Sequence, residues 1–207
     1  MYVPGSFAPP DETSLFDAIE RYSFALLLTG GGDELVASHL PLLLDRTLGE
    51  RVTLLGHMAR TNEQWKSAAG QPVLAVFSGP HAYVSPTWYE ATQVVPTWNY
   101  VAVHAYGRLE LIDDPAEAEQ LLQRTIDTYE RGMPRPWRLD ESPEWTQRLV
   151  AQIVAFRIPI ERLEGKWKLS QNHPAERREK VIAALERQRE ENGREIARLM
   201  RLGFGSQ

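Results

Sequence analysis

Cysteine is absent from the chain, and its absence excludes disulfides, thiolate metal sites and cysteine nucleophiles together. It also fits a reducing compartment, so we expect a cytoplasmic protein. Long hydrophobic runs are missing as well: FALLL and LPLLL are far too short to cross a bilayer, so we expect no membrane association. The opening residues, MYVPGSFAPPDETS, have neither the basic nor the apolar region of a signal peptide, and none is predicted.

Positive charge is not in excess either. The 207 residues carry a net charge of −5, which disfavours a generally basic nucleic-acid surface and leaves only a local patch for DNA. No P-loop, GxGxxG fingerprint or GxSxG elbow occurs. The five histidines form no HxH or HExxH pair, so a metal site would need ligands from distant segments, and we expect none.

Hydrophobic periodicity divides the chain into strands and helices. The predicted helices cover residues 11–22, 61–68, 113–132, 142–153 and 174 to about 193, with a short helical tail after them. The predicted strands cover residues 22–29, 35–45, 52–59, 72–79, 81–86, 98–112 and 154–165. Short strands joined by tight glycine turns, such as the hairpin turn at residues 30–32, favour an antiparallel barrel over parallel βαβ units. We therefore predict one α+β domain with helices at the edges of a barrel.

The stretch GHMARTNEQW, residues 56–65, is a candidate anion site. A strand ends here, and Arg60, Thr61 and Asn62 lead into the predicted short helix. A guanidinium, a hydroxyl, an amide and a helix N-terminus together suit a phosphate group. The alternative is an ordinary helix cap beside a surface arginine.

A second polar stretch, GKWKLSQN at residues 165–172, follows a predicted strand and precedes the last long helix. Five of its side chains can form hydrogen bonds: Lys166, Lys168, Ser170, Gln171 and Asn172. A binding role competes here with a simpler interpretation, in which Asn172 caps the helix and the lysines are solvated.

The stretch GPHAYVSPTWYEATQVVPTWNYVAVHAYG, residues 79–107, contains six aromatic residues and a single formal charge, Glu90. Tyr and Trp side chains combine an apolar face with a hydrogen-bonding tip, which suits subunit interfaces and pockets for flat ligands. An exposed patch of this kind would be a liability on a monomer. We therefore expect contact with a second subunit, a flat cofactor, or both.

Five blocks together resemble the PaiB-type family of FMN-binding negative transcriptional regulators: SHLPLLLD, GHMARTNEQW, FSGPHAYVSPTWY, VPTWNYVAVHAYG and KWKLSQN. That family is similar to the split-barrel flavoproteins that include pyridoxamine phosphate oxidase. The resemblance implies an antiparallel six-stranded split β-barrel with flanking helices. It also implies a single domain over residues 1–207, with residues 174–207 as a C-terminal helical extension, and a homodimer with FMN at the subunit interface.

The resemblance also implies contacts for each part of FMN. Arg60 and Asn62 would bind the phosphate, with His57 nearby. Three residues of one strand would lie along the isoalloxazine ring: Ser38, His39 and Leu40. Three donors would close over the cofactor, from the same or the neighbouring subunit: Lys168, Ser170 and Gln171. Four rings would line the pocket mouth or the dimer contact: His81, Tyr83, Trp88 and Trp98.

Three functions agree with these observations. The first is an FMN-binding homodimer that represses transcription, directly or through a small-molecule ligand. The second is a flavin-dependent oxidoreductase acting on an unassigned small molecule, with a histidine such as His81 or His104 in proton transfer. The third is a haem-binding split barrel. Direct DNA reading has weak sequence support, because residues 174–201 carry eight basic and six acidic side chains and no helix-turn-helix is evident.

Overall fold

The computed structural model describes residues 1–31, 34–47, 51–139 and 142–203. The chain divides into two compact units. The barrel unit comprises Ser23–Val76 and Ala105–Leu163, and the terminal unit comprises Met1–Tyr22, Phe77–His104 and Glu164–Gln207. Three long strands contribute residues to both units, and each unit is described by itself below. No helix within the described ranges is long and apolar enough to cross a membrane.

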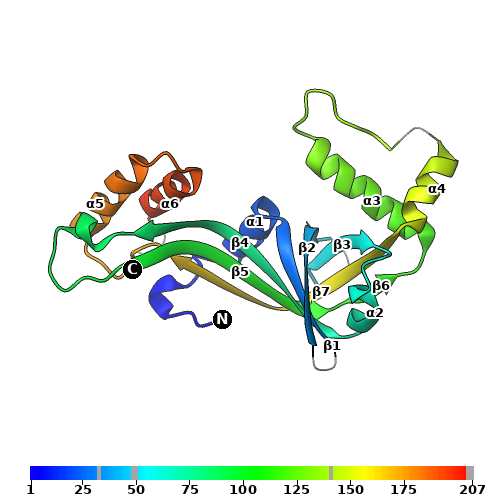
Figure 1. Ribbon diagram of the computed structural model, residues 1–207, viewed down its shortest axis with the longest axis horizontal. Helices are drawn as coiled ribbons and strands as arrows, with labels where there is room; N and C mark the ends of the chain where they lie inside the picture. The colour runs from blue at the N-terminus through cyan, green and yellow to red at the C-terminus, as the bar shows by residue number, and fades with distance from the viewer. Residues whose placement is uncertain (32–33, 48–50, 140–141, 204–207) are drawn as a thin grey trace. The chain divides into compact units, whose positions relative to one another are not determined.

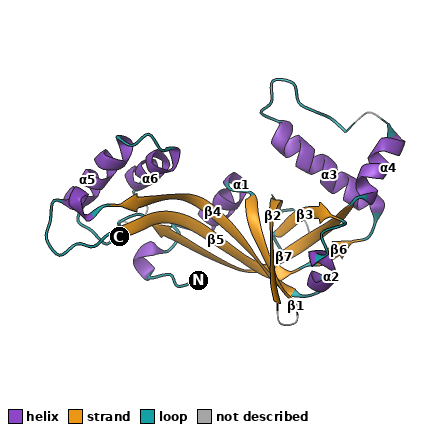
Figure 2. Cartoon of the chain, viewed as in Figure 1, coloured by secondary structure: helices purple, strands orange, loops and turns teal. Residues whose placement is uncertain are grey.

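The strands form one seven-stranded sheet (Figures 1 and 2). They are β1 (Phe24–Gly31), β2 (Glu34–Asp45), β3 (Thr53–Ala59), β4 (Pro72–Val84), β5 (Thr97–Arg108), β6 (Glu110–Ile112) and β7 (Ile153–Lys168). Their order is β3-β2-β1-β4-β5-β7-β6, and β3 also pairs with β7. This second pairing closes six strands into a ring and leaves β6 as an addition to β7. The predicted six-stranded antiparallel barrel is confirmed.

Close packing of the ring depends on two glycines. A β-carbon at Gly56 would lie 2.5 Å from Cδ2 of Leu42 and 2.8 Å from Cζ of Phe156, so the filled interior admits no side chain there. A β-carbon at Gly107 would overlap the backbone carbonyl of Pro159, which has little freedom to move. Gly107 therefore marks a place where neighbouring strands approach too closely for another residue, whereas a side chain at Gly56 would displace the buried side chains of Leu42 and Phe156.

Helices pack on the outer face of the barrel unit. They are α2 (Gln64–Ala68), α3 (Pro115–Glu130) and α4 (Pro143–Ala151). Asp114 and Ser142 cap α3 and α4 by accepting hydrogen bonds from the backbone of Ala116 and Trp145. One hydrophobic cluster joins the helices to the strands: Leu43, Leu55, Ile112, Ala118, Leu121, Ala155 and, at its edge, Val150.

The terminal unit holds residues 77–84 of β4, 97–104 of β5 and 164–168 of β7, together with the remaining helices. These are the short 3-10 helices η1 (Gly5–Phe7) and η2 (Pro86–Tyr89), and α1 (Glu12–Arg21), α5 (Ala175–Glu186) and α6 (Glu191–Arg201). Asp11 caps α1 by accepting from the backbone of Ser14 at 2.7 Å. Side chains alternate along β5, since Val101 and Val103 are buried while Tyr100 is half-buried.

Several elements differ from the sequence prediction, and three of the differences are described here. Residues 72–86 were predicted as two strands, but β4 is continuous. The pairing of β4 with β1 runs from Val73 to Val76, so Pro80 lies beyond it and removes no hydrogen bond from that ladder. The predicted strand 98–112 is interrupted at Leu109, whose backbone hydrogen-bonds to Gly70 and Gln71 instead of continuing the ladder.

The third difference is the C-terminal helix, which is two helices rather than one with a tail. The backbone of Gln188 bonds back to Leu185 at 3.1 Å, which tightens the end of α5. Glu190 is extended, so the chain turns before α6 begins. This turn lets the buried side chains of α6, including Ile196 and Met200, face those of α5. Of the predicted turn at residues 30–32, Gly32 lies outside the described residues, while Gly31 pairs with Glu34.

An ion pair holds α3 against the barrel. Asp45, at the end of β2, is only 2% exposed, and one of its carboxylate oxygens accepts a hydrogen bond from Nη1 of Arg124 at 2.5 Å. The other oxygen accepts from the backbone and the hydroxyl of Thr47, both at 2.8 Å. Burial alone would raise the pKa of Asp45, but the hydrogen bonds from Arg124 and Thr47 outweigh it and lower the pKa to about 2.

We expect Asp45→Asn to lower the free energy of unfolding by roughly 2 kcal/mol at pH 7. Because the folded-state pKa is depressed, this stabilisation is present above about pH 4 and is lost as the pH falls towards about 2. Urea unfolding at pH 7 and pH 3 checks this, with Asp127→Asn, at an exposed position on α3, as control. If the free energies of unfolding of wild type and Asp45→Asn differed by the same amount at both pH values, the stabilising role of the Asp45 carboxylate would be contradicted.

Candidate functional site

The nine side chains expected to contact FMN fall into two groups. The barrel unit holds Ser38, His39, Leu40, His57, Arg60 and Asn62. The terminal unit holds Lys168, Ser170 and Gln171. Each group is built by the local structure of its own unit.

Ser38 and Asn62 form a polar cluster between β2 and α2. The side-chain amide of Asn62 donates to the hydroxyl of Ser38 at 2.9 Å, and its oxygen accepts from the backbone of Gln64 at 3.2 Å. Gln64 is 3% exposed, and its amide donates to Thr29 at 3.1 Å and to two strand carbonyls. Its oxygen has no partner within the described residues. The cluster therefore contains one buried acceptor that is free to receive a donor.

Arg60 ties the end of β3 to the start of β7. Its Nε donates to the carbonyl of Ala151 at 2.8 Å, and its Nη2 donates to the carbonyl of Ile153 at 2.6 Å. Its backbone N–H also donates to Gln152, at 2.8 Å. The helix α2 has only five residues, so its dipole adds little to an anion site. The structure thus gives Arg60 an anchoring role that the sequence does not reveal, and leaves Nη1 for another acceptor.

His39 and Ser38 point to opposite faces of β2, because successive strand residues alternate. On its face, the ring of His39 stacks on Phe24 with centroids 5.8 Å apart. Phe24 is 65% exposed and Leu35, which shares this face, is 81% exposed. Leu40 lies on the Ser38 side and is half-buried. The three residues predicted to follow one flat ring therefore do not present one common surface.

His57 lines a cavity of about 430 Å³ beneath α3 and α4. We call this cavity the His57 pocket; its lining is His57, Ala59, Leu122, Ile126, Trp137, Leu149, Gln152 and Ile153. The Nδ1 atom of His57 is buried, and no group in the described residues bonds to it. Burial lowers the pKa of His57, which favours the neutral imidazole. The pocket is therefore mostly apolar, with one polar atom that needs a partner.

The terminal-unit group is part of an internal network. Ser170 is 3% exposed and has a left-handed backbone, with φ of 61°. Its hydroxyl accepts from Asn99, which is fully buried, at 3.0 Å and lies 3.4 Å from the hydroxyl of Tyr89. Gln171 caps the end of β7 by accepting from the backbone of Leu169 at 2.7 Å. Lys168 is bonded to Thr97 and is half-buried.

The aromatic residues of segment 79–107 separate into buried and exposed sets. Tyr89 is 1% exposed and its ring packs against His173 with centroids 4.5 Å apart, while Trp88 is half-buried. Tyr83 and Trp98 are 45% and 52% exposed. Sequence reasoning identified this segment as unusual but did not separate the two sets.

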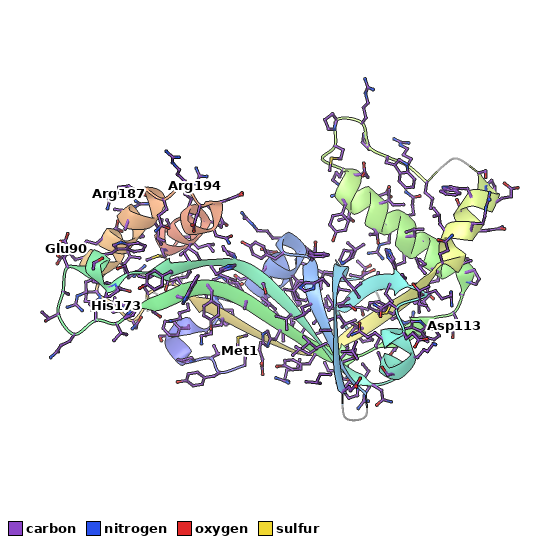
Figure 3. The ribbon with its side chains drawn as sticks, viewed as in Figure 1. Met1, Glu90, Asp113, His173, Arg187 and Arg194 are labelled. Atoms are coloured by element: carbon purple, nitrogen blue, oxygen red, sulfur yellow. The ribbon has the colours of Figure 1, made fainter. Side chains whose placement is uncertain are left out.

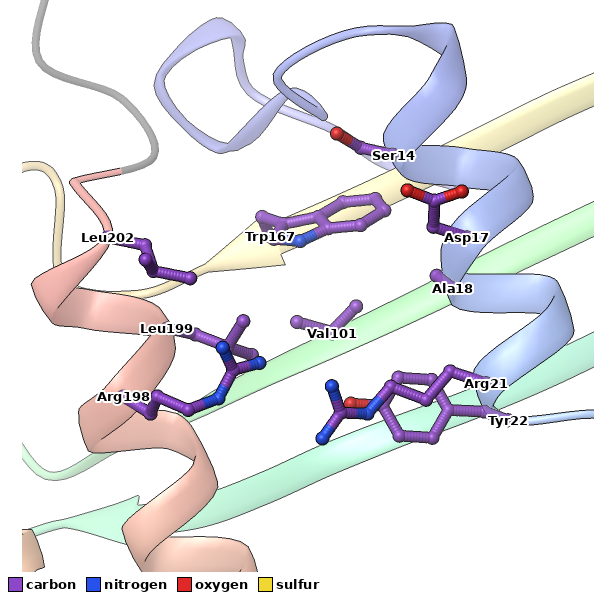
Figure 4. A pocket seen from close by; sticks show the side chains of 10 residues that line it. All are labelled: Ser14, Asp17, Ala18, Arg21, Tyr22, Val101, Trp167, Arg198, Leu199 and Leu202. Carbon is purple, nitrogen blue, oxygen red and sulfur yellow. The ribbon is translucent and has the colours of Figure 1, made fainter. Parts of the chain in front are cut away.

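A smaller cavity of about 190 Å³ lies between α1 and α6, and no sequence signal marked it. Trp167 forms its inner wall, and the guanidinium groups of Arg21 and Arg198 approach each other at its mouth (Figure 4). Glu195 bridges them, at 3.0 Å from Arg21 and 2.8 Å from Arg198. The bond from Arg198 lowers the pKa of Glu195. The pairing neutralises most of the local charge, and the cluster mainly joins α1 to α6.

Comparison with known proteins places the chain in a family. Residues 1–162 match the family described as "Putative FMN-binding domain". The chain belongs to this family. It is 33% identical to the Protease synthase and sporulation protein PAI 2 of Bacillus subtilis over 97% of this chain and 96% of that protein. The PaiB-type resemblance is thereby confirmed.

Solved structures confirm the fold. The flavocytochrome Anf3 from Azotobacter vinelandii matches 78% of this chain and 69% of its own, with 14% identity and a TM-score of 0.58. The FAD and heme binding protein from Mycobacterium smegmatis matches 77% of this chain and 72% of its own, with 15% identity and a TM-score of 0.56. At this identity the likeness concerns the fold alone.

Proposed function

We propose that this chain is an FMN-binding homodimer that acts as a PaiB-type negative regulator of transcription. The observation that carries the proposal is the family match over residues 1–162, together with 33% identity to a PaiB-type relative along nearly the whole chain. The barrel unit supplies a pocket whose chemistry fits a flavin. When bound, FMN supplies hydride or electron transfer, and the residues below hold and orient it.

The His57 pocket is the proposed site of the flavin ring. Its apolar side chains suit a flat aromatic system, and its volume of about 430 Å³ lies within the usual range for ligand pockets. A buried ring nitrogen without a partner is costly, because its desolvation is not compensated. A neutral imidazole can donate or accept at Nδ1, depending on its tautomer. A polar edge of the flavin would supply the missing bond to His57.

Arg60 is the proposed phosphate contact. Its two bonded nitrogens fix the guanidinium on the carbonyls of Ala151 and Ile153. Arg60 itself lines an adjoining cavity of about 480 Å³, which shares Ile153 with the His57 pocket. The remaining Nη1 is the donor that we assign to a phosphate oxygen. Contacts from Ser38, His39, Leu40 and Asn62, none of which lines the His57 pocket, stay a prediction from the resemblance. Contacts from Lys168, Ser170 and Gln171 stay a prediction from the resemblance.

The homodimer is proposed from the exposed face of β1 and β2. Phe24 and Leu35 are 65% and 81% exposed there, and His39 lies between them on the same face. Large apolar side chains grouped on a strand surface favour burial by a second copy. A second copy on this face would shelter these side chains from water.

Direct DNA reading by α6 is disfavoured by its ion pairs. Arg198 forms two hydrogen bonds of 2.8 Å to Glu195, and Arg201 binds Glu186 at 2.8 Å. Arg187 and Arg194 lie on the outer side of the α5–α6 pair (Figure 3). Phosphate contacts need unpaired cations, whose counterions are released on binding. We therefore propose that regulation proceeds through the flavin or a ligand-bound state. A flavin-dependent oxidoreductase is the second candidate, because the His57 pocket could also admit a substrate.

His57→Leu is the sharpest test of the flavin site. Leucine fills a similar volume and removes the unpartnered nitrogen, so the free energy of unfolding without FMN should stay the same or rise. FMN affinity should fall at least about tenfold, measured by fluorescence quenching of the flavin. Glu12→Gln, at an exposed position on α1, is the control. Unchanged FMN affinity in His57→Leu would remove the flavin from this pocket.

Arg60→Met separates phosphate binding from ring binding. If Nη1 contacts the phosphate, the variant should lose about tenfold or more in FMN affinity but little in riboflavin affinity. Lost bonds to Ala151 and Ile153 should also lower the free energy of unfolding by about 1 kcal/mol. Both ligands are titrated into wild type and variant, and urea unfolding measures the stability. An equal loss for FMN and riboflavin would show that Arg60 acts only by anchoring the fold.

Spectra and DNA binding distinguish the candidate functions. We expect the purified protein to show a flavin spectrum, with FMN released on denaturation and identified by mass; a Soret band would indicate haem instead. Repression through the flavin predicts that promoter DNA binding, measured by mobility shift, changes with the redox state of FMN. Repeated bleaching by a nicotinamide nucleotide and recovery in air would favour the oxidoreductase. If promoter DNA binding were the same with oxidised FMN, with reduced FMN and without FMN, the proposed form of regulation would be contradicted.

A further inference from the structure

The terminal unit contains an open groove of about 680 Å³ between the outer parts of β4 and β5 and the turn that joins α5 to α6. We call it the aromatic groove. Its lining residues are His81, Ala82, Tyr83, Trp98, Gln188, Glu190, Glu191 and Asn192. None of them belongs to the flavin site proposed above. The groove therefore raises a separate question of what it binds.

One wall of the groove is aromatic. Trp98 meets Tyr83 edge to face, with centroids 5.9 Å apart, and it meets the ring of His81 at 6.1 Å. His81 and Tyr83 point outward because Ala82 and Val84, which alternate with them on β4, are buried. Since Tyr83 and Trp98 are 45% and 52% exposed, their rings are available to a ligand.

The other wall is acidic. Glu190 and Glu191 begin α6, and both are exposed. Along the described stretches of chain, no basic side chain forms an ion pair with either carboxylate. Glu186 and Glu195 differ in this respect, since arginines of α6 pair with both. The groove thus carries two carboxylates without ion-pair partners beside its aromatic rings.

The aromatic and acidic walls together favour one class of ligand. The face of an aromatic ring is electron-rich and attracts a cation, most strongly when the ring is tryptophan. Two carboxylates strengthen that attraction and repel anions. A bare metal ion would gain little from the rings, whereas an ammonium group carrying methyl or methylene groups can contact both walls. The basic residues nearest in sequence, Arg187 and Arg189, do not line the groove.

We propose that the aromatic groove binds a small organic cation, namely an alkylammonium or quaternary ammonium compound. Its charged head lies against Trp98 and Tyr83 and close to Glu190 and Glu191. The volume of about 680 Å³ leaves room for an apolar body beyond the head. This site does not depend on flavin binding, so failure of either proposal leaves the other intact.

The test compares choline with 3,3-dimethyl-1-butanol, which has the same shape without the charge. Saturation-transfer NMR at about pH 8, where histidine side chains carry little charge, follows binding to the full chain. We expect choline to bind saturably and its neutral isostere at least about tenfold more weakly. Trp98→Leu should abolish choline binding, and the double variant Glu190→Gln, Glu191→Gln should weaken it several-fold and reduce its salt dependence.

A matched control lies on α4, where Glu144 and Trp145 are also adjacent and exposed. Glu144→Gln and Trp145→Leu should leave choline binding unchanged. The proposal is overturned if choline and its isostere bind equally, or if the variants of the groove bind choline as the wild type does. It is also overturned if the wild type does not bind choline while Trp98→Leu changes the oligomeric state, because a second copy would then occupy the groove.

Discussion

Closure of the barrel depends on β3, whose backbone pairs with β2 on one edge and with β7 on the other. Its register with β7 extends over the whole strand, from Thr53 opposite Pro159 to Ala59 opposite Ile153. A strand paired on both sides cannot shift without breaking two ladders, and a shift by one residue would turn its side chains to the opposite face. The ladders therefore fix Leu55 and His57 on the outer face, and Gly56 in the interior against Leu42 and Phe156.

This fixed face explains where the candidate site lies. At one end of β3, Leu55 is buried in the cluster under α3, and the ion pair between Asp45 and Arg124 holds the helix there. Two residues along, His57 lies in a cavity instead of a filled core. The same strand thus supplies stability at one end and an unfilled pocket at the other. Arg60 continues this arrangement, because its bonds to Ala151 and Ile153 hold the end of β3 to the chain segment that lines the pocket.

Local sequence patterns predict much of the fold because they record local physics. Alternation along β5 and the caps of α1, α3 and α4 follow from strand geometry and from unsatisfied helix N–H groups. The break at Leu109 could not be predicted in this way, because its backbone partners, Gly70 and Gln71, lie far away in the sequence. The candidate site is harder to predict from the sequence than the fold. Ser38 and His39 are adjacent in the sequence and were expected to contact the same ring, yet their side chains face opposite sides of β2.

Segment 79–107 shows why a pattern can identify a region without revealing its role. Its low charge has two separate causes. Tyr89 and Asn99 are buried and bond to Ser170, so the segment supplies part of a polar network in which a charge would be costly. Tyr83 and Trp98 are exposed on the strands, where charge is supplied instead by Glu190 and Glu191 from another element. A sequence window averages these two environments, and only the paired strands and the turn before α6 separate them.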